Sequence, residues 1–241
     1  MMTETDAALL LPERIRRVRS RMDEAARRSH RSTAEITLVA VSKTHAVAAI
    51  QTAINAGLTE FGENRVQEAE RKIPSLGRES ARWHLIGHLQ SNKARRAVEL
   101  FDVIHSLDSV ALAHRLDRIC QEVSRESLPV LIQVDLGHEA TKSGVDAGSI
   151  RELITETGRC ARLQLTGLMT LPPFFDEVES VRPYFRRLRE LRDELRAEGA
   201  FGDGPGELSM GMTHDFEVAI EEGATIVRVG TAIFGERERM L

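Results

Sequence analysis

Hydrophobic periodicity predicts an amphipathic helix near the start of the chain. Apolar side chains recur there at steps of four, three, four and three residues. They are Leu11, Ile15, Val18, Met22 and Ala25. This spacing places them on one helical face. Pro12 would fit the first turn of that helix, because the N–H that proline lacks has no helical partner there. We therefore expect residues 1–34 to form a leading helix and its connection.

After this helix, short apolar runs rich in β-branched residues alternate with helical stretches. The predicted strands cover residues 36–42, 58–62, 83–87, 103–106, 129–135, 163–169, 207–209 and 225–230. The predicted helices between them cover residues 47–56, 65–73, 92–100, 110–123, 149–157, 184–197 and 214–222. A helix between two strands returns the chain to begin the next strand in the same direction, so this pattern favours a parallel α/β fold. We predict one (β/α)8 TIM barrel over residues 35–241, and a single domain over residues 1–241.

A six-stranded doubly wound sheet is the main alternative. It would apply if the short run at 207–209 and the weak run at 103–106 were not strands. However, no GxGxxG motif follows the first predicted strand, and this motif is typical of dinucleotide-binding sheets. The barrel therefore remains the favoured architecture.

Composition indicates a globular protein with no electrostatic preference for nucleic acid or membranes. The chain has 241 residues, 41% of them hydrophobic and 29% charged, with a net charge of −4. These values do not fit a disordered chain, and they create no strong field toward nucleic-acid phosphates or anionic lipids. The arginines of the leading helix lie opposite its apolar stripe, and Asp23 and Glu24 interrupt them, so we interpret them as a solvated face. Lys93, Arg95 and Arg96 are interpreted in the same way.

Cysteine usage and apolar run lengths suggest a cytoplasmic protein. Cys120 and Cys160 stand alone in apolar runs without a CxxC motif, which favours reduced core thiols. The apolar run at 7–11 is too short for a signal-peptide core, and no stretch approaches the roughly 20 apolar residues of a membrane span. His84 and His88 are four residues apart, but on a strand and its exit, so we predict no metal site.

A lysine at the end of the first strand is the first candidate for chemistry. Barrel proteins concentrate function in the loops at the carboxyl ends of the strands. Side chains alternate along a strand, so Val41 and Lys43 share a face, with Lys43 at the exit. A lysine whose pKa is lowered by burial or a nearby cation has a neutral amine that can attack an aldehyde.

An arginine in the last strand is the second candidate. Ile226, Arg228 and Gly230 share one face of this strand. If that face lines the barrel, Arg228 is a buried cation and needs an acceptor, because an unpaired buried charge is very costly. The pattern leaves two options open, namely an ion pair with an acid such as Asp135, or a ligand that supplies the acceptor.

The turns after the last two strands are candidates for binding phosphate. Loops after strands seven and eight of a barrel commonly bind phosphate through backbone N–H groups. Gly230 and Thr231 follow the last strand, and Thr213 and Asp215 suit the N-cap and first turn of the preceding helix. Ordinary capped turns would give the same pattern. Lysine, phosphate site and inward arginine together fit a phosphorylated aldehyde held as a Schiff base, and pyridoxal phosphate is the obvious one.

Several long motifs resemble one protein family. They are VAVSKTH, FGENRVQE, WHLIGHLQSNK, IHSLD, TKSGV, GLMTLP and LSMGMTHDFEVAIEEGATIVRVGTAIFG. In this order and spacing they closely resemble the YggS/PROSC family of pyridoxal-phosphate homeostasis proteins, from about residue 39 to residue 235. The resemblance implies a barrel like the N-terminal domain of alanine racemase. It also implies intracellular buffering or delivery of pyridoxal 5'-phosphate to apoenzymes rather than substrate turnover, and we expect a monomer.

The resemblance also implies which residues hold the cofactor. They are Lys43, Asn64, Ser209, Met210, Gly211, Arg228, Gly230 and Thr231. Lys43 would form the Schiff base, Asn64 would lie beside the cofactor, and Arg228 would face the pyridine nitrogen. Ser209, the Met210 and Gly211 backbone, and the Gly230–Thr231 pair would hold the phosphate. His45, Thr213 and His214 depart from the family pattern, and we expect His214 to face solvent.

A racemase-like enzyme with weak or no activity is the alternative function. Racemisation by two bases needs an acid/base group opposite the lysine, which in alanine racemase is a tyrosine from a separate domain. The chain has one tyrosine, Tyr184, in a helix whose apolar period includes Leu188, Leu191 and Leu195. Packing is the better interpretation of Tyr184. We therefore predict that the protein is not an enzyme and assign no catalytic residue. A sugar-phosphate enzyme that uses Lys43 is a further alternative, and it would carry no bound chromophore.

Overall fold

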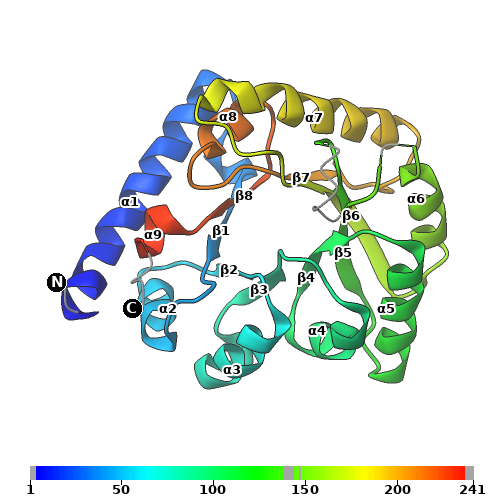
Figure 1. Cartoon of the computed structure of the whole chain (residues 1–241), viewed down its shortest axis with the longest axis horizontal. Coiled ribbons are helices and arrows are strands. Elements are labelled where there is room, and N and C mark those ends of the chain that lie inside the picture. Colours follow the sequence, from blue (N-terminus) through cyan, green and yellow to red (C-terminus); the bar gives the residue numbers. More distant parts are fainter. Residues whose placement is uncertain (1–3, 138–143, 147, 237–241) are drawn as a thin grey trace.

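Eight parallel strands close into a barrel in the order of the sequence (Figure 1). The structure is a computed structural model that describes residues 4–137, 144–146 and 148–236. The strands are β1 (Thr37–Val41), β2 (Glu60–Glu63), β3 (Arg82–Leu85), β4 (Val103–Leu107), β5 (Leu128–Val134), β6 (Leu163–Thr170), β7 (Glu207–Ser209) and β8 (Ile226–Val229). Pairing of β8 with β1, in which Ala40 lies opposite Val229, closes the ring. All eight predicted strands are present, so the open six-stranded alternative is wrong.

Helices cover the outside of the barrel and connect its strands. They are α2 (Val47–Asn55), α3 (Val66–Leu76), α4 (Ala94–Leu100), α5 (Val110–Glu122), α6 (Ile150–Gly158), α7 (Arg182–Ala197), α8 (Phe216–Glu221) and α9 (Thr231–Phe234). Short 3₁₀ helices lie at Thr33–Glu35, Arg78–Ser80, Ser91–Lys93 and Val178–Val181. In the described part of the chain, no helix combines the length and apolar character that crossing a membrane requires. The (β/α)8 TIM barrel is confirmed.

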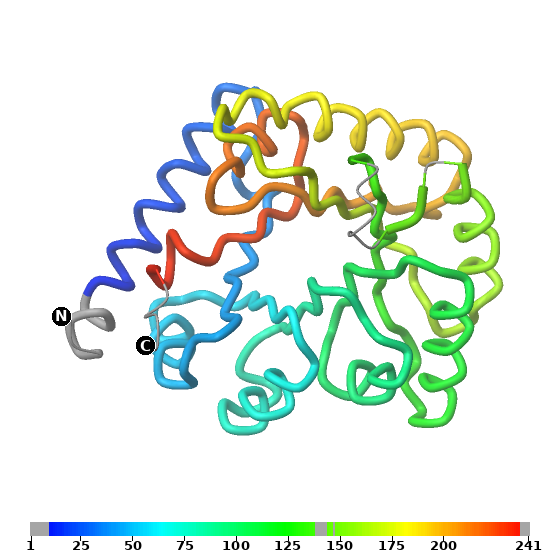
Figure 2. The backbone as a smooth tube through the Cα atoms, viewed as in Figure 1, coloured from blue at the N-terminus to red at the C-terminus, as the bar shows by residue number. Residues whose placement is uncertain are grey.

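The additional N-terminal helix α1 (Glu4–Arg28) takes the place of a full-length eighth barrel helix. Because α9 has four residues, it cannot cover the barrel between α8 and α2. Helix α1 contacts α8, α9 and α2, and Figure 2 shows the two ends of the described chain side by side. The predicted apolar stripe lies in this interface, and its residues are all buried.

The position predicted for Pro12 is wrong. Helix α1 begins at Glu4, and Pro12 lies inside it with its side chain exposed. A proline inside a helix costs about 3 kcal/mol, because it removes one hydrogen bond and crowds the preceding turn. Full burial of a leucine or isoleucine gives roughly 1.5–3 kcal/mol each, and Leu11 and Ile15 on either side of Pro12 are both buried. Packing of these neighbours therefore offsets the cost of the proline.

The barrel interior has an apolar layer that ends in a polar one. The apolar layer is a cluster of side chains from five strands. They are Val39, Val103, Leu131, Met169 and Ile226. His105, Gln133 and Arg228 each follow a member of this cluster by two residues and are buried. Since side chains alternate along a strand, they point into the same interior, one step nearer the carboxyl ends.

The apolar stripe of α7 begins one residue later than predicted. Phe185, Leu188, Leu191 and Leu195 are buried, whereas Tyr184 is half-buried with its ring 5.6 Å from that of Phe175. Steps of three, three and four residues from Phe185 follow a helical face. The packing role predicted for Tyr184 is confirmed, but Phe185 is the first member of the stripe.

Both cysteines are buried and free, as predicted. Burial raises the pKa of the Cys160 thiol to about 11, and burial also raises the pKa of Cys120. Both thiols are therefore protonated at neutral pH, and reactivity requires the thiolate. This supports the prediction of structural cysteines.

Candidate functional site

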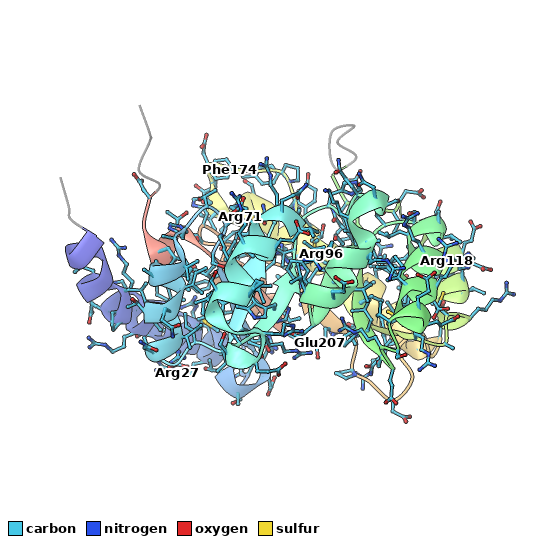
Figure 3. The ribbon with its side chains drawn as sticks, turned by 90° about the horizontal axis from the view of Figure 1, so that it is seen from below. Arg27, Arg71, Arg96, Arg118, Phe174 and Glu207 are labelled. Atoms are coloured by element: carbon cyan, nitrogen blue, oxygen red, sulfur yellow. The ribbon has the colours of Figure 1, made fainter. Side chains whose placement is uncertain are left out.

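The predicted site residues meet at the carboxyl ends of four neighbouring strands. In the closed barrel the order β7, β8, β1, β2 is continuous. Ser209 ends β7, Arg228 lies in β8, and the remaining residues follow the ends of these strands. They are Met210 and Gly211 after β7, Gly230 and Thr231 after β8, Lys43 after β1, and Asn64 after β2. Figure 3 views the barrel from the side and places Phe174, beyond the end of β6, at this end of the molecule.

Lys43 and the turn after β8 are close because β1 and β8 are paired. A Cβ atom on Gly230 would lie 3.3 Å from the Val41 carbonyl oxygen. The end of β8 therefore passes close to the strand that carries Lys43, which is half-buried. Any larger residue at position 230 would narrow this contact. One small molecule could therefore reach both Lys43 and the turn after β8.

The residue after Lys43 has an unusual backbone conformation. Thr44 has a φ of 66°, a value that is uncommon for residues other than glycine. Its N–H donates a hydrogen bond of 2.8 Å to Glu68 Oε2 on α3. Burial raises the pKa of Glu68, but the Thr44 N–H and Lys72 outweigh it and hold the pKa of this carboxyl below its ordinary value. The carboxylate thereby fixes the turn that carries Lys43.

A buried ion cluster anchors the residue before Lys43. Lys72 Nζ donates to the Ser42 carbonyl oxygen at 2.9 Å, to Glu63 Oε1 at 2.8 Å and to Glu68 Oε2 at 3.2 Å. Ser42 Oγ donates to Glu63 Oε1 at 2.7 Å. Burial raises the pKa of Glu63, although the ammonium of Lys72 opposes this. Sequence reasoning missed this cluster, for which the four-residue spacing of Glu68 and Lys72 was the available signal.

The turns after β7 and β8 are joined through one threonine hydroxyl. Thr213 Oγ1 accepts from the N–H of Gly230 at 3.3 Å and from the N–H of Ala232 at 3.5 Å. The backbone donors of the turn after β8 therefore converge on an oxygen atom, as they would in an anion site. Gly211 has a φ of 89°, and a Cβ there would lie 2.5 Å from Ala219 Cβ. Only glycine fits that position without displacing α8.

The capping roles predicted for Thr213 and Asp215 in the turn after β7 are wrong. Asp215, not Thr213, is the N-cap of α8, and its Oδ1 accepts the Met212 N–H at 2.6 Å. Thr213 lies two residues before this cap, and its hydroxyl accepts from Gly230 and Ala232 beyond the end of β8 instead. The Met210 N–H donates to Ile226 O in the barrel. His214 is exposed, as predicted, and its ring lies 5.1 Å from that of Phe174.

Arg228 is a buried cation inside the barrel, with an exposed fraction of 2%. Its Nη1 donates to Ser209 Oγ at 2.6 Å and its Nη2 donates to Thr170 O at 2.9 Å. Burial lowers its pKa to about 10, so the guanidinium stays charged at neutral pH. These acceptors are neutral oxygens, rather than the carboxylate of Asp135 that the pattern had offered as one option.

Ser209 belongs to a chain of polar side chains that crosses the barrel. Its Oγ lies 2.8 Å from His105 Nδ1, and His105 Nε2 lies 2.8 Å from His84 Nδ1. His84 Nε2 lies 2.6 Å from Glu60 Oε2. Sequence reasoning considered His84 as a metal ligand and passed over Glu60, which directly precedes the motif FGENRVQE, and His105, which occurs in the motif IHSLD. We refer to Glu60, His84, His105 and Ser209 as the relay.

Comparison with known families agrees with this fold. Residues 15–238 match the family model of the alanine racemase N-terminal domain. The pyridoxal phosphate homeostasis protein of Aquifex aeolicus is 45% identical over 228 residues, which cover 94% of this chain and 98% of that protein. The homeostasis protein of Escherichia coli K12 is 42% identical over 224 residues, which cover 92% of this chain and 94% of that protein.

Solved structures lead to the same family. The structure of PipY from Synechococcus elongatus without PLP has a TM-score of 0.83 and 41% identity, and covers 93% of this chain and 100% of that one. PipY with PLP bound has a TM-score of 0.81 and 40% identity, with the same coverage. Alanine racemase from Corynebacterium glutamicum shares the fold, with a TM-score of 0.65 and 19% identity, over 92% of this chain and 63% of that one. The chain therefore belongs to the family of pyridoxal phosphate homeostasis proteins.

Proposed function

We propose that this protein binds pyridoxal 5'-phosphate at the carboxyl end of the barrel and takes part in intracellular cofactor homeostasis. The observation that carries the proposal is that Lys43 and the turns after β7 and β8 follow the carboxyl ends of neighbouring strands, and that Gly230 approaches the Val41 carbonyl oxygen. In those turns, the Gly230 and Ala232 N–H groups converge on one oxygen. The names of the relatives and the bound PLP of PipY support the same ligand.

The residues present fit the cofactor's three functional groups. A phosphate needs the backbone donors and the glycine-lined turns at Gly211 and Gly230, with Ser209, Met210 and Thr231 beside them. The pyridine ring would meet Arg228, and Asn64 would lie beside it. A cation at the ring nitrogen disfavours its protonation and so weakens the ring as an electron sink.

Lys43 is the residue that would hold the cofactor covalently. The bound cofactor would supply an aldehyde carbon, to which a neutral lysine amine adds with loss of one water to give a C=N bond, the Schiff base. The Lys72 cluster and the Thr44 N–H hold the backbone on both sides of Lys43. A fixed backbone limits the positions that the lysine amine can take, which favours addition at one place.

A carrier that buffers or delivers the cofactor fits the site better than a racemase. Two-base racemisation needs a second acid/base group facing the lysine across the substrate. The one tyrosine of the sequence, Tyr184, packs against Phe175. Weak racemase-like activity remains the alternative function. We propose that the protein is a cytoplasmic monomer and that apoenzymes receive the cofactor from it. Mixing the loaded protein with an apoenzyme and measuring transfer of the cofactor would test the delivery.

Spectroscopy with chemical trapping tests the covalent link. The full-length protein is incubated with pyridoxal phosphate, its absorption spectrum is recorded, and the complex is reduced with borohydride and mapped by mass spectrometry. We expect a new absorption band and a modification at Lys43. The matched control is Lys93→Ala, which changes a half-buried lysine at the end of the 3₁₀ helix that precedes α4. Labelling that persists elsewhere in Lys43→Ala, with an unchanged spectrum, would contradict the proposal.

A further inference from the structure

We propose that Glu60, His84 and His105 are positioning residues that act on Arg228 through Ser209. They connect the buried guanidinium to a carboxylate near the opposite end of the barrel. The part of this inference that concerns the cofactor rests on the proposed function. The part that concerns the hydrogen-bond direction rests on the geometry alone.

The relay follows the barrel wall and then crosses the interior. Glu60 is the first residue of β2, and its neighbours His84 and His105 lie in β3 and β4. From His105 the relay crosses to Ser209 in β7, which receives the guanidinium of Arg228 in β8. His84, His105, Ser209 and Arg228 are at most 2% exposed, whereas the Glu60 side chain is 21% exposed.

Glu60 reaches a cavity at the other end of the molecule. This cavity of about 390 Å³ lies at the amino ends of β1 and β2 and is lined by Thr37, Leu38, Thr59 and Glu60, among others. Part of this carboxylate is therefore open to solvent, so its desolvation penalty is smaller than that of a fully buried acid. The relay thus joins a partly solvated anion to a cation that lies inside the barrel.

The chemistry of each group fixes one direction for the hydrogen bonds. A guanidinium only donates, so Arg228 donates to Ser209 Oγ. A carboxylate only accepts, so Glu60 accepts from His84 Nε2. If His84 is neutral, its Nδ1 accepts from His105 Nε2, and His105 Nδ1 accepts the hydroxyl proton of Ser209. Every donor in this arrangement points toward Glu60, and each proton is used once.

The opposite direction requires an additional buried charge. His84 would carry protons on both nitrogens, and the hydroxyl proton of Ser209 would lose His105 as its acceptor. Burial, together with the charges of His84, Arg228 and Arg82, lowers the pKa of His105 well below its ordinary value. His105 is neutral in both arrangements, so the choice between them rests on the additional charge that the opposite direction would place on the buried His84.

A metal site does not explain this cluster. The ring nitrogens of His84 and His105 are bonded to each other and to their neighbours, rather than aimed at a common point. Within residues 4–137, 144–146 and 148–236, no group of three or more histidine, cysteine, aspartate or glutamate residues could hold a metal ion. Chains of hydrogen bonds polarise one another, so the relay makes Ser209 Oγ a stronger acceptor and holds Arg228 in place.

Nitrogen NMR of the histidine side chains in the ligand-free protein tests the direction. We expect His84 and His105 both to carry their proton on Nε2. A proton on Nδ1 of His105 would overturn the proposal. This measurement needs neither cofactor nor a variant, so its outcome is independent of whether Lys43 forms a Schiff base.

The variant Glu60→Gln tests the effect on Arg228. It removes the charge but keeps the shape and an acceptor oxygen, and we expect affinity for pyridoxal phosphate to fall roughly 3- to 10-fold, as when a charge-assisted hydrogen bond becomes a neutral one. Affinity for inorganic phosphate alone should fall less than affinity for pyridoxal phosphate, because Ser209 is the one residue that the relay shares with the proposed phosphate site, whereas Arg228 would face the ring. In an Arg228→Gln background, Glu60→Gln should have no further effect.

The surface pair of His114 and Glu156, at 3.2 Å, provides a matched control. The variant Glu156→Gln removes the carboxylate from a histidine in the same way, and both affinities should stay unchanged. An equal loss in Glu60→Gln with and without Arg228 would exclude coupling through the relay. If Glu60→Gln does not fold, the nitrogen shifts of the unmodified protein still decide the direction. If the unmodified protein fails to bind pyridoxal phosphate, the proposed function is wrong. The direction of the relay is then decided by the nitrogen shifts alone.

Discussion

Arg228 shows how a single buried charge shapes the interior of this barrel. Removing a guanidinium from water costs several kcal/mol unless hydrogen bonds and charge compensate it. Arg228 has two neutral acceptors, Ser209 Oγ and Thr170 O, and Asp215 raises its pKa through a longer-range charge interaction. A barrel packed with aliphatic side chains would avoid this cost. The proposed contact with a ligand at this end of the barrel would explain why an arginine is present here.

His105 makes the stability of the protein depend on pH. Burial, His84 and Arg228 lower its pKa in the folded state below the ordinary 6.5. Just below pH 6.5 this histidine is therefore protonated in the unfolded chain and neutral in the folded chain. The free energy of unfolding therefore falls as pH drops below about 6.5, with a slope of up to about 1.4 kcal/mol per pH unit from this group. His105 should contribute a loss of about 1 kcal/mol to the difference that urea unfolding shows between pH 7 and pH 5.5.

Variants separate the contribution of His105 from that of the other histidines. In His105→Asn the difference between pH 7 and pH 5.5 should shrink by this amount, whereas the exposed His114→Gln should retain it. The carboxyls whose pKa is lowered, such as Glu221 and Glu222, titrate below this interval and leave the comparison intact. Equal pH dependence in His105→Asn and the unmodified protein would contradict the assignment.

Single residues differ in how far the sequence reveals them. Lys43 and Arg228 could be found because strand alternation and strand exits are local features. The relay could not, because its members are separated by 24, 21 and 104 positions in the chain. Their contact depends on closure of the barrel and on which faces point inward. Thr213 was misassigned as a cap for the same reason, since its partners Gly230 and Ala232 follow β8.

At the scale of elements, α3 acts as a brace for the turn after β1. Glu68 and Lys72, one helical turn apart on α3, bind the backbone of Thr44 and Ser42. Lys72 is 8% exposed and Glu63 is fully buried, so the ion pair is shielded from solvent and from salt. Strain at Thr44 is tolerated because these bonds surround it, as is common at functional sites. Helix α3 thereby fixes the loop after β1, which lies elsewhere in the sequence.

Gly211 joins the turn after β7 to α8, and its replacement should damage both. Gly211→Ala forces a side chain into a left-handed conformation, which costs roughly 1–2 kcal/mol. It also places a Cβ 2.5 Å from Ala219 Cβ and 3.0 Å from Phe216 Cα. Because the second contact is with backbone, α8 must shift. We therefore expect thermal unfolding of Gly211→Ala to show a loss of stability larger than this conformational cost alone, and we expect weaker binding of pyridoxal phosphate.

Gly57→Ala is the matched control for this steric effect. Gly57 has a φ of 85°, close to that of Gly211, but a Cβ there would meet nothing within 4 Å. The variant Gly57→Ala should lose only the stability that the left-handed backbone costs an alanine, about 1–2 kcal/mol. Its affinity for the cofactor should not change. Equal losses in both variants would show that the turn after β7 accommodates the added carbon.

At the scale of the whole molecule, the two ends of the chain complete the barrel together. The eight strand–helix units could be predicted because parallel strands and amphipathic helices have distinct hydrophobic periods. Which helix fills the eighth position could not, since α1 and α9 are at opposite ends of the sequence and meet only after closure (Figure 2). The start of α1 was also missed, because Pro12 is a start signal that tertiary packing overrides.

Helix α1 should therefore stabilise the cofactor site from a distance. It packs on α8 and α9, which follow the two proposed phosphate turns. Ile15→Ala removes buried volume in this interface, where Ile15 is 2% exposed, and should lower the free energy of unfolding by about 2–5 kcal/mol. Hydrogen exchange should accelerate in α8 and α9 more than in α4, which lies across the barrel. The exposed Arg17→Ala, on the same helix, should change stability by less than about 0.5 kcal/mol. Uniform acceleration over all helices would instead mean that α1 supports the whole fold rather than this site.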